Sequence, residues 1–316
     1  MSSSSSLLTM DRVTRLYGDV IGANDISLEL APGAYGLLGP NGSGKTTLLN
    51  LITGRLHPTI GRINLLGFEP WNNAELYRRV GMCPSVSQLY PNISAYDWVN
   101  YLLKLQGHSK SQAKKDAEKA LDLVKMTGAM HRKMGEFSRG MRQRTKLAQA
   151  IAHEPELLIL DEPFSGLDPI GRHDLTEILK HQINQGKSVI LASHILHEVE
   201  TVTDSFLLIF GGRLLASGSA EEVHSMMVDV PNEISLKCSK PDLLSKHFVS
   251  DQSVLAVQID RESSTLTVST KSPKSFYETL PRWAKETNSS ISEVRSSDES
   301  LQDLFDSLMR IHRGEK

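Results

Sequence analysis

The segment "GPNGSGKTT", Gly39 to Thr47, constrains the fold of this chain more than any other. It fits the pattern G-x-x-x-x-G-K-[ST], and it lies between an apolar run that predicts a strand, "AYGLLG" (34–39), and a segment with a helical pattern. The glycines let the backbone wrap closely around an anion. The segment therefore predicts a phosphate-binding loop that joins a strand to a helix.

Two side chains of this loop can contact the rest of a bound nucleotide. Lys45 would reach the β- and γ-phosphates, and the Thr46 hydroxyl would ligate Mg²⁺. The alternative is a glycine-rich turn that binds nothing, but the strand before the loop and the helix after it argue against that interpretation. The predicted nucleotide-binding residues of the loop are Gly39, Pro40, Asn41, Gly42, Ser43, Gly44, Lys45, Thr46 and Thr47.

Apolar runs and helical patterns alternate over most of the chain. The clearest further strands are "ELLILDE" (156–162), "SVILASH" (188–194) and "SFLLIF" (205–210). This alternation predicts an α/β fold with a parallel sheet covered by helices. The unbroken "LLIL" predicts a strand that is buried on both faces. A helix is predicted between Gly44 and Gly54, and the stretch at about 90–153 reads as a helical subdomain.

An acidic pair follows one of these strands. Asp161 would lie at the carboxyl end of the strand, where open α/β sheets bind ligands, and a carboxylate there suits Mg²⁺. Glu162 can polarise an attacking water, and general-base help of this kind is worth roughly 10²–10⁴ in rate. The alternative is that the pair only caps the next helix. Its occurrence beside a phosphate loop favours the catalytic interpretation.

The pattern of predicted elements changes near residue 229. We therefore expect a disordered tail at 1–9, a first domain at 10–228 and a second domain at 229–316. The second domain has the order β-α-β-β-α-β of the ferredoxin-like motif, and Ser272 and Pro273 begin its second helix. A last helix would carry a stripe of apolar side chains: Leu301, Leu304, Phe305 and Leu308.

Charge, cysteine content and apolar run length exclude several classes of function. A formal net charge of −2 gives no reason to expect nucleic acid as a partner. The two cysteines, Cys83 and Cys238, lie too far apart in sequence to indicate a disulfide framework or a cysteine metal site. No apolar run approaches the roughly 20 residues that cross a bilayer. We expect a cytoplasmic protein whose association with a membrane depends on a partner.

Three further segments complete a recognisable order of motifs: "FSRGM" (137–141), "SGLD" (165–168) and "ASH" (192–194). With them, residues 10–228 resemble the ATPase subunits of ATP-binding-cassette (ABC) transporters, most closely the bacterial export systems with separate membrane subunits. In this resemblance "GPNGSGKTT" is similar to the Walker A motif and "LLILDE" to the Walker B motif. The other three segments are similar to the signature sequence, the D-loop and the switch-histidine segment.

The resemblance implies a fold, cofactors and site residues. The fold would be a P-loop ABC ATPase domain with a helical subdomain, followed by a small C-terminal α+β domain. The cofactors would be ATP and Mg²⁺. Lys45, Glu162 and His194 would be catalytic, with His194 sensing the γ-phosphate. Tyr17 in "RLYGD" would stack on adenine, and Asp168 would be the acid of the D-loop.

The resemblance also implies partners. In this family two ATPase domains pair head to tail, and the signature helix of each contacts the γ-phosphate bound by the other. Ser138 and Gly140 would make that contact here, helped by the dipole of the helix that they begin. A homodimer is therefore expected, bound to integral membrane subunits on the inner face of the cell membrane.

The chain departs from the family pattern in the loop with Ser85 and in the signature sequence. In "GMCPSVSQLYP", Ser85 stands where the family has a glutamine that contacts Mg²⁺, and Gln88 follows three residues later. Serine reaches less far, so it needs an inward shift of the loop or a bridging water to act on the metal; alternatively, the site is specialised away from turnover. In the signature, Arg139 and Met141 replace a small residue and an amide.

Two other functions compete with transport as interpretations of these motifs. A soluble ABC ATPase in an assembly or maturation role is the alternative. Repair and chromosome-maintenance members carry coiled-coil or zinc insertions and translation factors carry two cassettes, whereas this sequence has neither feature. A GTP-binding switch protein is disfavoured because the sequence has no Asn-Lys-x-Asp motif. The transported substrate and the direction of transport are not encoded in these motifs.

Overall fold

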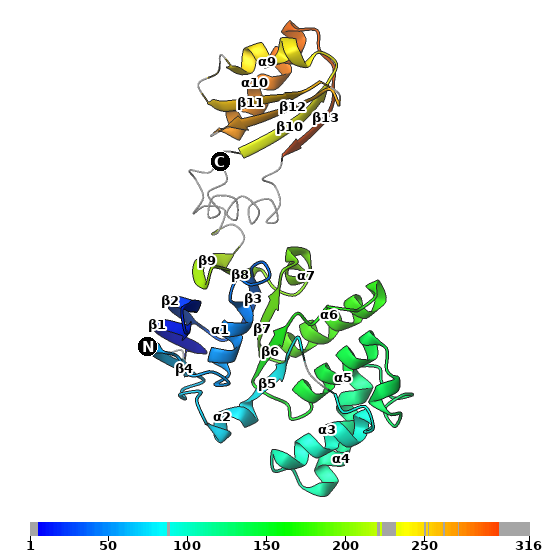
Figure 1. Ribbon diagram of the computed structural model, residues 1–316. Helices are drawn as coiled ribbons and strands as arrows, with labels where there is room; N and C mark the ends of the chain where they lie inside the picture. Colours follow the sequence, from blue (N-terminus) through cyan, green and yellow to red (C-terminus); the bar gives the residue numbers. More distant parts are fainter. Residues whose placement is uncertain are drawn as a thin grey trace. The chain divides into compact units, whose positions relative to one another are not determined.

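The computed structural model describes residues 6–86, 89–219, 222, 232–249, 251, 253–261, 263–270 and 272–296 (Figure 1). The chain divides into two compact units, Met1–Ser219 and Ala220–Lys316, and each is described by itself. The boundary predicted between 228 and 229 lies outside the described residues, as does the helix predicted around Leu301.

A six-stranded sheet forms the centre of the first unit, with strand order β5-β6-β7-β3-β8-β9. Its first five strands are parallel, and only the edge strand β9 runs antiparallel. All residues of β6 and β7 are buried, and for β6 the unbroken run "LLIL" predicted this. The strands are β3 (Ala34–Leu38), β5 (Val80–Cys83), β6 (Leu157–Asp161), β7 (Ser188–Ser193), β8 (Ser205–Phe210) and β9 (Arg213–Ser219).

A second, antiparallel sheet was not predicted. It consists of β1 (Leu8–Tyr17), β2 (Val20–Leu30) and β4 (Ile60–Leu65), in the order β2-β1-β4. The prediction of a disordered tail over residues 1–9 is therefore wrong for its last residues, since β1 begins at Leu8. Leu7 and Leu8 are buried, so their apolar side chains hold the start of β1 in the core.

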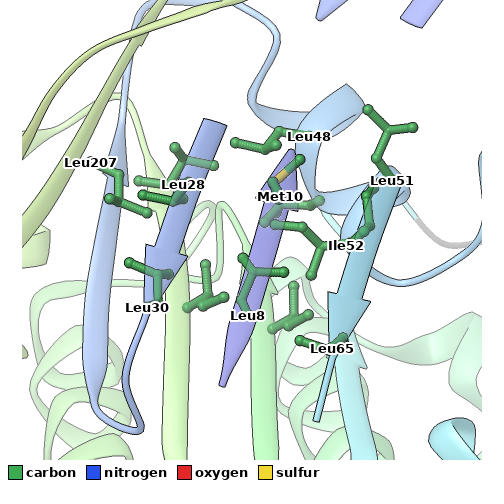
Figure 2. Close-up of a cluster of buried hydrophobic side chains, with 14 of the residues drawn as sticks. Leu8, Met10, Leu28, Leu30, Leu48, Leu51, Ile52, Leu65 and Leu207 are labelled. Atoms are coloured by element: carbon green, nitrogen blue, oxygen red, sulfur yellow. The ribbon is translucent and has the colours of Figure 1, made fainter. Parts of the chain in front are cut away.

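The phosphate loop leads into α1 (Lys45–Ile52), which packs in the core between the two sheets. Gly54 follows the helix in a left-handed conformation, as the predicted helix end required. Figure 2 shows leucines of the antiparallel sheet meeting α1 and Leu207 of β8. The side chains labelled there are Leu8, Met10, Leu28, Leu30, Leu48, Leu51, Ile52, Leu65 and Leu207.

Helices gather at one end of the first unit, in the stretch that the sequence marked as helical (Figure 1). They are α3 (Ala95–Leu105), α4 (Lys110–Leu123), the short 3₁₀ helix η1 (Met134–Glu136) and α5 (Arg139–Ile151). Each of the three α-helices begins at a serine whose hydroxyl accepts a backbone N–H bond, an N-cap that stabilises a helix start. The remaining helices of this unit are α2 (Ala74–Arg79), α6 (Pro169–Asn184) and α7 (Leu196–Glu200).

The second unit has a four-stranded antiparallel sheet in the order β11-β12-β10-β13. Its elements are β10 (Asn232–Cys238), α9 (Pro241–Val249), β11 (Val254–Asp260), β12 (Thr265–Thr270), α10 (Pro273–Glu286) and β13 (Ile291–Ser296). Their sequence is the β-α-β-β-α-β order of the ferredoxin-like motif. Leu236 and Val268 of the sheet pack against Phe248 and Phe276 of the helices. Within the described ranges, no helix has the length and apolar composition that a bilayer crossing requires.

Gly81 in β5 is expected to be a sensitive packing position. A Cβ there would lie 2.0 Å from the Ala150 carbonyl oxygen at the end of α5 and 2.9 Å from Leu158 Cδ2. Overpacking of this kind costs about 1–3 kcal/mol, so Gly81→Ala should lower the free energy of unfolding by about that amount in urea titrations. Gly128→Ala is the matched control, because a Cβ at Gly128 meets nothing within 4 Å. Equal effects at the two positions would contradict this packing argument.

Candidate nucleotide-binding site

The phosphate loop between β3 and α1 is folded tightly around the amine of Lys45. The Lys45 Nζ donates to the carbonyl oxygens of Gly39 at 2.6 Å and Pro40 at 3.2 Å. Gly44 has φ = 108°, and a Cβ there would lie 2.7 Å from the Gly22 carbonyl oxygen. Only glycine fits such a conformation at such a distance. The backbone therefore forms the closed turn that the sequence predicted.

Lys45 brings a buried positive charge to the loop. Its side chain is 6% exposed, and Nζ lies 3.6 Å from Glu162 Oε1. Burial lowers the pKa of Lys45, whereas the negative charges of Glu162 and Asp161 raise it. The Lys45 ammonium group therefore has two carbonyl oxygens and one carboxylate as partners. It is placed to exchange them for an anion that binds in the loop.

Asp161 is the meeting point of three elements. Thr46 at the start of α1 donates its hydroxyl to Asp161 Oδ2 at 3.0 Å, and Ser85, which follows β5, donates to the same oxygen at 2.9 Å. Asp161 is 2% exposed, and its other oxygen, Oδ1, is buried and has no hydrogen-bond partner among the described residues. A buried carboxylate oxygen without a partner is costly unless something pairs with it.

This donor set fits Mg²⁺. The ion prefers oxygen ligands and is held by one or two carboxylates together with waters and phosphate oxygens, rather than by a full protein cage. Asp161 offers one such carboxylate, and Thr46 and Ser85 offer hydroxyl oxygens beside it. In the part of the chain that the structure describes, no group of three or more His, Cys, Asp or Glu side chains forms a metal cage.

Glu162 and His194 form a pair at the ends of β6 and β7. Glu162 Oε2 lies 2.9 Å from His194 Nδ1, while Glu162 Oε1 accepts no hydrogen bond from any described residue. The backbone of Glu162 is left-handed, with φ = 50°, and its N–H donates to the Ala192 carbonyl oxygen at 2.9 Å. Such a conformation costs on the order of 1–3 kcal/mol and is typical of functional positions. Here it orients the carboxylate toward Lys45.

Tyr17 lies at the margin of the loop. A Cβ on Gly22 would lie 2.5 Å from the Tyr17 ring and 3.1 Å from the Thr47 methyl group, so the ring packs beside the start of α1. Tyr17 is 43% exposed, and the Arg15 guanidinium lies 5.0 Å from the centre of its ring. A partly exposed aromatic face in this place is available to stack on a base.

The signature residues lie apart from the phosphate loop. Ser138 is the N-cap of α5, and its hydroxyl accepts the Met141 N–H at 3.2 Å. A Cβ on Gly140 would lie 3.6 Å from Leu167 Cδ2, which places Gly140 beside the D-loop segment 165–168. Asp168 caps α6 by accepting the Gly171 N–H at 2.7 Å. Among the hydrogen bonds and ion pairs of the described residues, none joins Ser138, Gly140 or Asp168 to the phosphate loop.

Lys146 was missed in the sequence. It lies on α5, is 7% exposed, and donates through Nζ to the carbonyl oxygens of Pro84 at 2.9 Å and Ser85 at 3.0 Å. Burial lowers the pKa of Lys146, and Cys83 and Asp161 raise it in part. The available signal was a lysine on the buried face of an amphipathic helix, since Gln143, Leu147 and Ala150 share that face.

The fold and the site together define a P-loop nucleotide-binding domain, with an acidic residue of the same sheet facing the loop. The family model described as ABC transporter matches residues 23–165. An uncharacterized ABC transporter ATP-binding protein of Synechocystis sp. is 37% identical over 218 residues, 68% of this chain and 61% of the relative. Nod factor export ATP-binding protein I of Cupriavidus metallidurans is 34% identical, over 69% of this chain and 73% of the relative.

A solved structure agrees with these relatives. It is titled as the ATP-binding subunit of an ABC transporter and is similar to this chain with a TM-score of 0.64 and 27% identity, over 70% of this chain and 93% of that one. The chain belongs to the ABC transporter family, as a member of its ATP-binding subunits. The family resemblance inferred from the motifs is therefore confirmed.

Proposed function

We propose that this chain is the ATP-hydrolysing subunit of an ABC exporter and that it powers transport through separate membrane subunits. The observation that carries the proposal is the cluster in which Glu162 and Asp161 contact the phosphate loop, Glu162 at Lys45 and Asp161 at Thr46. The relative from C. metallidurans is named as an export protein, and that name supports export as the direction. The cytoplasmic face of a membrane is the corresponding location.

In this proposal the residues of the loop hold the triphosphate. Lys45 contacts the β- and γ-phosphates, and the backbone of residues 39–47 surrounds them. Thr46 and Asp161, with Ser85 beside them, would hold Mg²⁺, which supplies neutralisation of phosphate charge when it is bound. The Tyr17 ring stacks on the base. Each role uses an atom that lies within or beside the cluster described above.

Glu162 acts as the general base. Its Oε2 lies 2.9 Å from His194 Nδ1, and its buried Oε1 has no hydrogen bond from any described residue but forms the 3.6 Å ion pair with Lys45. Once Lys45 exchanges this carboxylate for the phosphates, Oε1 can take a proton from an attacking water. His194 is 44% exposed, which leaves part of its ring accessible to a γ-phosphate. The pair therefore links the base to the γ-phosphoryl group that is transferred to water.

A second copy of the chain completes each site. Ser138 and Gly140 begin a 13-residue helix whose N-terminal N–H groups favour an anion, yet within the described part of the chain they bind no phosphate-loop residue. Head-to-tail pairing would bring them to the nucleotide of the other copy. The proposed assembly is a homodimer with membrane subunits.

Transport coupling is tested by reconstitution. The full-length tagged chain should remain with a single integral membrane protein after extraction of native membranes in mild detergent, and that protein in proteoliposomes should increase the ATPase rate of the purified chain. ATPase activity that is unchanged by the membrane protein, with the chain wholly in the soluble fraction, would favour the alternative role in assembly or maturation.

A further inference from the structure

Lys146 connects the signature helix to the loop that carries Ser85. Lys146 is only 7% exposed. Burial of its ammonium group costs free energy unless hydrogen bonds compensate for the lost water. Two of its three donors are used within one short segment, on the carbonyl oxygens of Pro84 and Ser85. Lys146 therefore holds the backbone on both sides of Ser85 from the body of α5.

The side chain of the same serine is held from the opposite direction. Ser85 Oγ donates to Asp161 Oδ2 at 2.9 Å, beside the bond from Thr46 to that oxygen. A serine side chain is short, so this bond requires the loop backbone to lie close to Asp161. The two bonds from Lys146 fix the backbone in such a place. A continuous path of hydrogen bonds thus runs from α5 through Ser85 to Asp161.

We propose that Lys146 is a positioning residue, which holds Ser85 on Asp161 from the signature helix and thereby sets how strongly Mg²⁺ supports ATP binding. The inference rests on the proposed function of this site as a Mg²⁺–ATP site. It explains how a serine can contact Asp161 at this position. The side chain is short, but Lys146 holds the loop backbone close to Asp161. It also makes α5 and the metal-binding carboxylate parts of one connected unit within a single chain.

A purely structural role of Lys146 would give a different result in ATP-binding measurements. If Lys146 only satisfied two buried carbonyl groups, its removal would lower stability and weaken ATP binding equally with and without metal. If Lys146 positions Ser85, its removal weakens ATP binding mainly when Mg²⁺ is present. The quantity that separates the two is the ratio of the ATP dissociation constant in EDTA to that in saturating Mg²⁺.

This ratio can be measured by titration calorimetry on the full chain and its variants. We expect Ser85→Ala and Lys146→Met each to reduce the ratio roughly fivefold, which is the effect of about one hydrogen bond. The double variant should reduce it no further than either single variant, because the two residues act through the same contact. Lys187→Met is the matched control: Lys187 is half-buried and donates to Gln182 at 2.8 Å, and its ratio should equal that of the wild type.

Two results would overturn the inference. The first is an unchanged ratio in Lys146→Met, whether the affinity is native or falls equally in EDTA and in Mg²⁺. The second is that the effects of the two single variants add in the double variant. If Lys146→Met does not fold, Lys146→Gln supplies the test. Its amide can still donate one hydrogen bond to these carbonyl oxygens, so we expect a ratio between those of the wild type and Lys146→Met. A wild-type ratio of one would instead refute the proposed Mg²⁺ site, and the inference with it.

Discussion

Lys45→Ala is expected to abolish tight ATP binding. The amine is the only lysine group among the described contacts of the phosphate loop, and it is buried beside Glu162. Hydrogen bonds to charged groups contribute about 1.5–3 kcal/mol each. The loss of two such bonds to phosphate oxygens should weaken ATP binding at least ~100-fold. Titration calorimetry with MgATP measures the change directly.

The control for this variant is a lysine outside the site. Lys114 is exposed on α4, so Lys114→Ala should bind ATP as the wild type does. Circular dichroism and the thermal midpoint in the absence of nucleotide establish that Lys45→Ala is folded. Near-native affinity in a folded Lys45→Ala protein would refute the assignment of this loop as the triphosphate site.

The central part of the fold could be predicted because its signals are local. The strands β3, β6, β7 and β8 are continuous apolar runs, which is the pattern of a strand buried on both faces. The glycines of the loop after β3 allow the tight backbone turn that an anion-binding loop requires, so they indicate the loop without tertiary information. The strand ends then place Asp161 beside Thr46 without further information, since carboxyl ends of parallel strands lie at one edge of the sheet.

The antiparallel sheet could not be predicted in the same way. The pairing of β1 with β2 shifts register between Met10 and Val13 and again beyond it, and Arg12 and Asp25 have left-handed backbones. Each irregularity breaks the alternation of apolar and polar residues that identifies a strand. In addition, β4 pairs with β1 although the phosphate loop and α1 separate the two in sequence. Such pairing depends on the tertiary fold.

Contacts between residues on opposite sides of the site also could not be predicted from the sequence. The short reach of Ser85 suggested a shifted loop or a bridging water, and the structure has the Ser85 hydroxyl bonded directly to Asp161. The group that holds this loop is Lys146, which lies 61 residues later on a helix of another layer. No local pattern connects two such positions, because only the packing of α5 against β5 brings them together.

The second large effect is expected at the proposed base. Glu162→Gln should bind ATP with nearly native affinity but hydrolyse it roughly 10²–10⁴ times more slowly. The amide keeps the size of the carboxylate, and its oxygen can still accept a hydrogen bond from His194, whose Nδ1 lies 2.9 Å from Oε2. It cannot accept a proton from water. Steady-state phosphate release and ATP titration separate the two effects.

The same variant also tests the shared site. If ATP holds two copies together and hydrolysis releases them, a protein that binds ATP without turnover should accumulate as a dimer. Light scattering after size-exclusion chromatography in saturating MgATP measures this. Glu177→Gln, which changes an exposed residue of α6, should hydrolyse ATP and distribute between states as the wild type does. A strictly monomeric Glu162→Gln protein would contradict head-to-tail pairing, whereas wild-type turnover in that variant would instead remove Glu162 from the role of base.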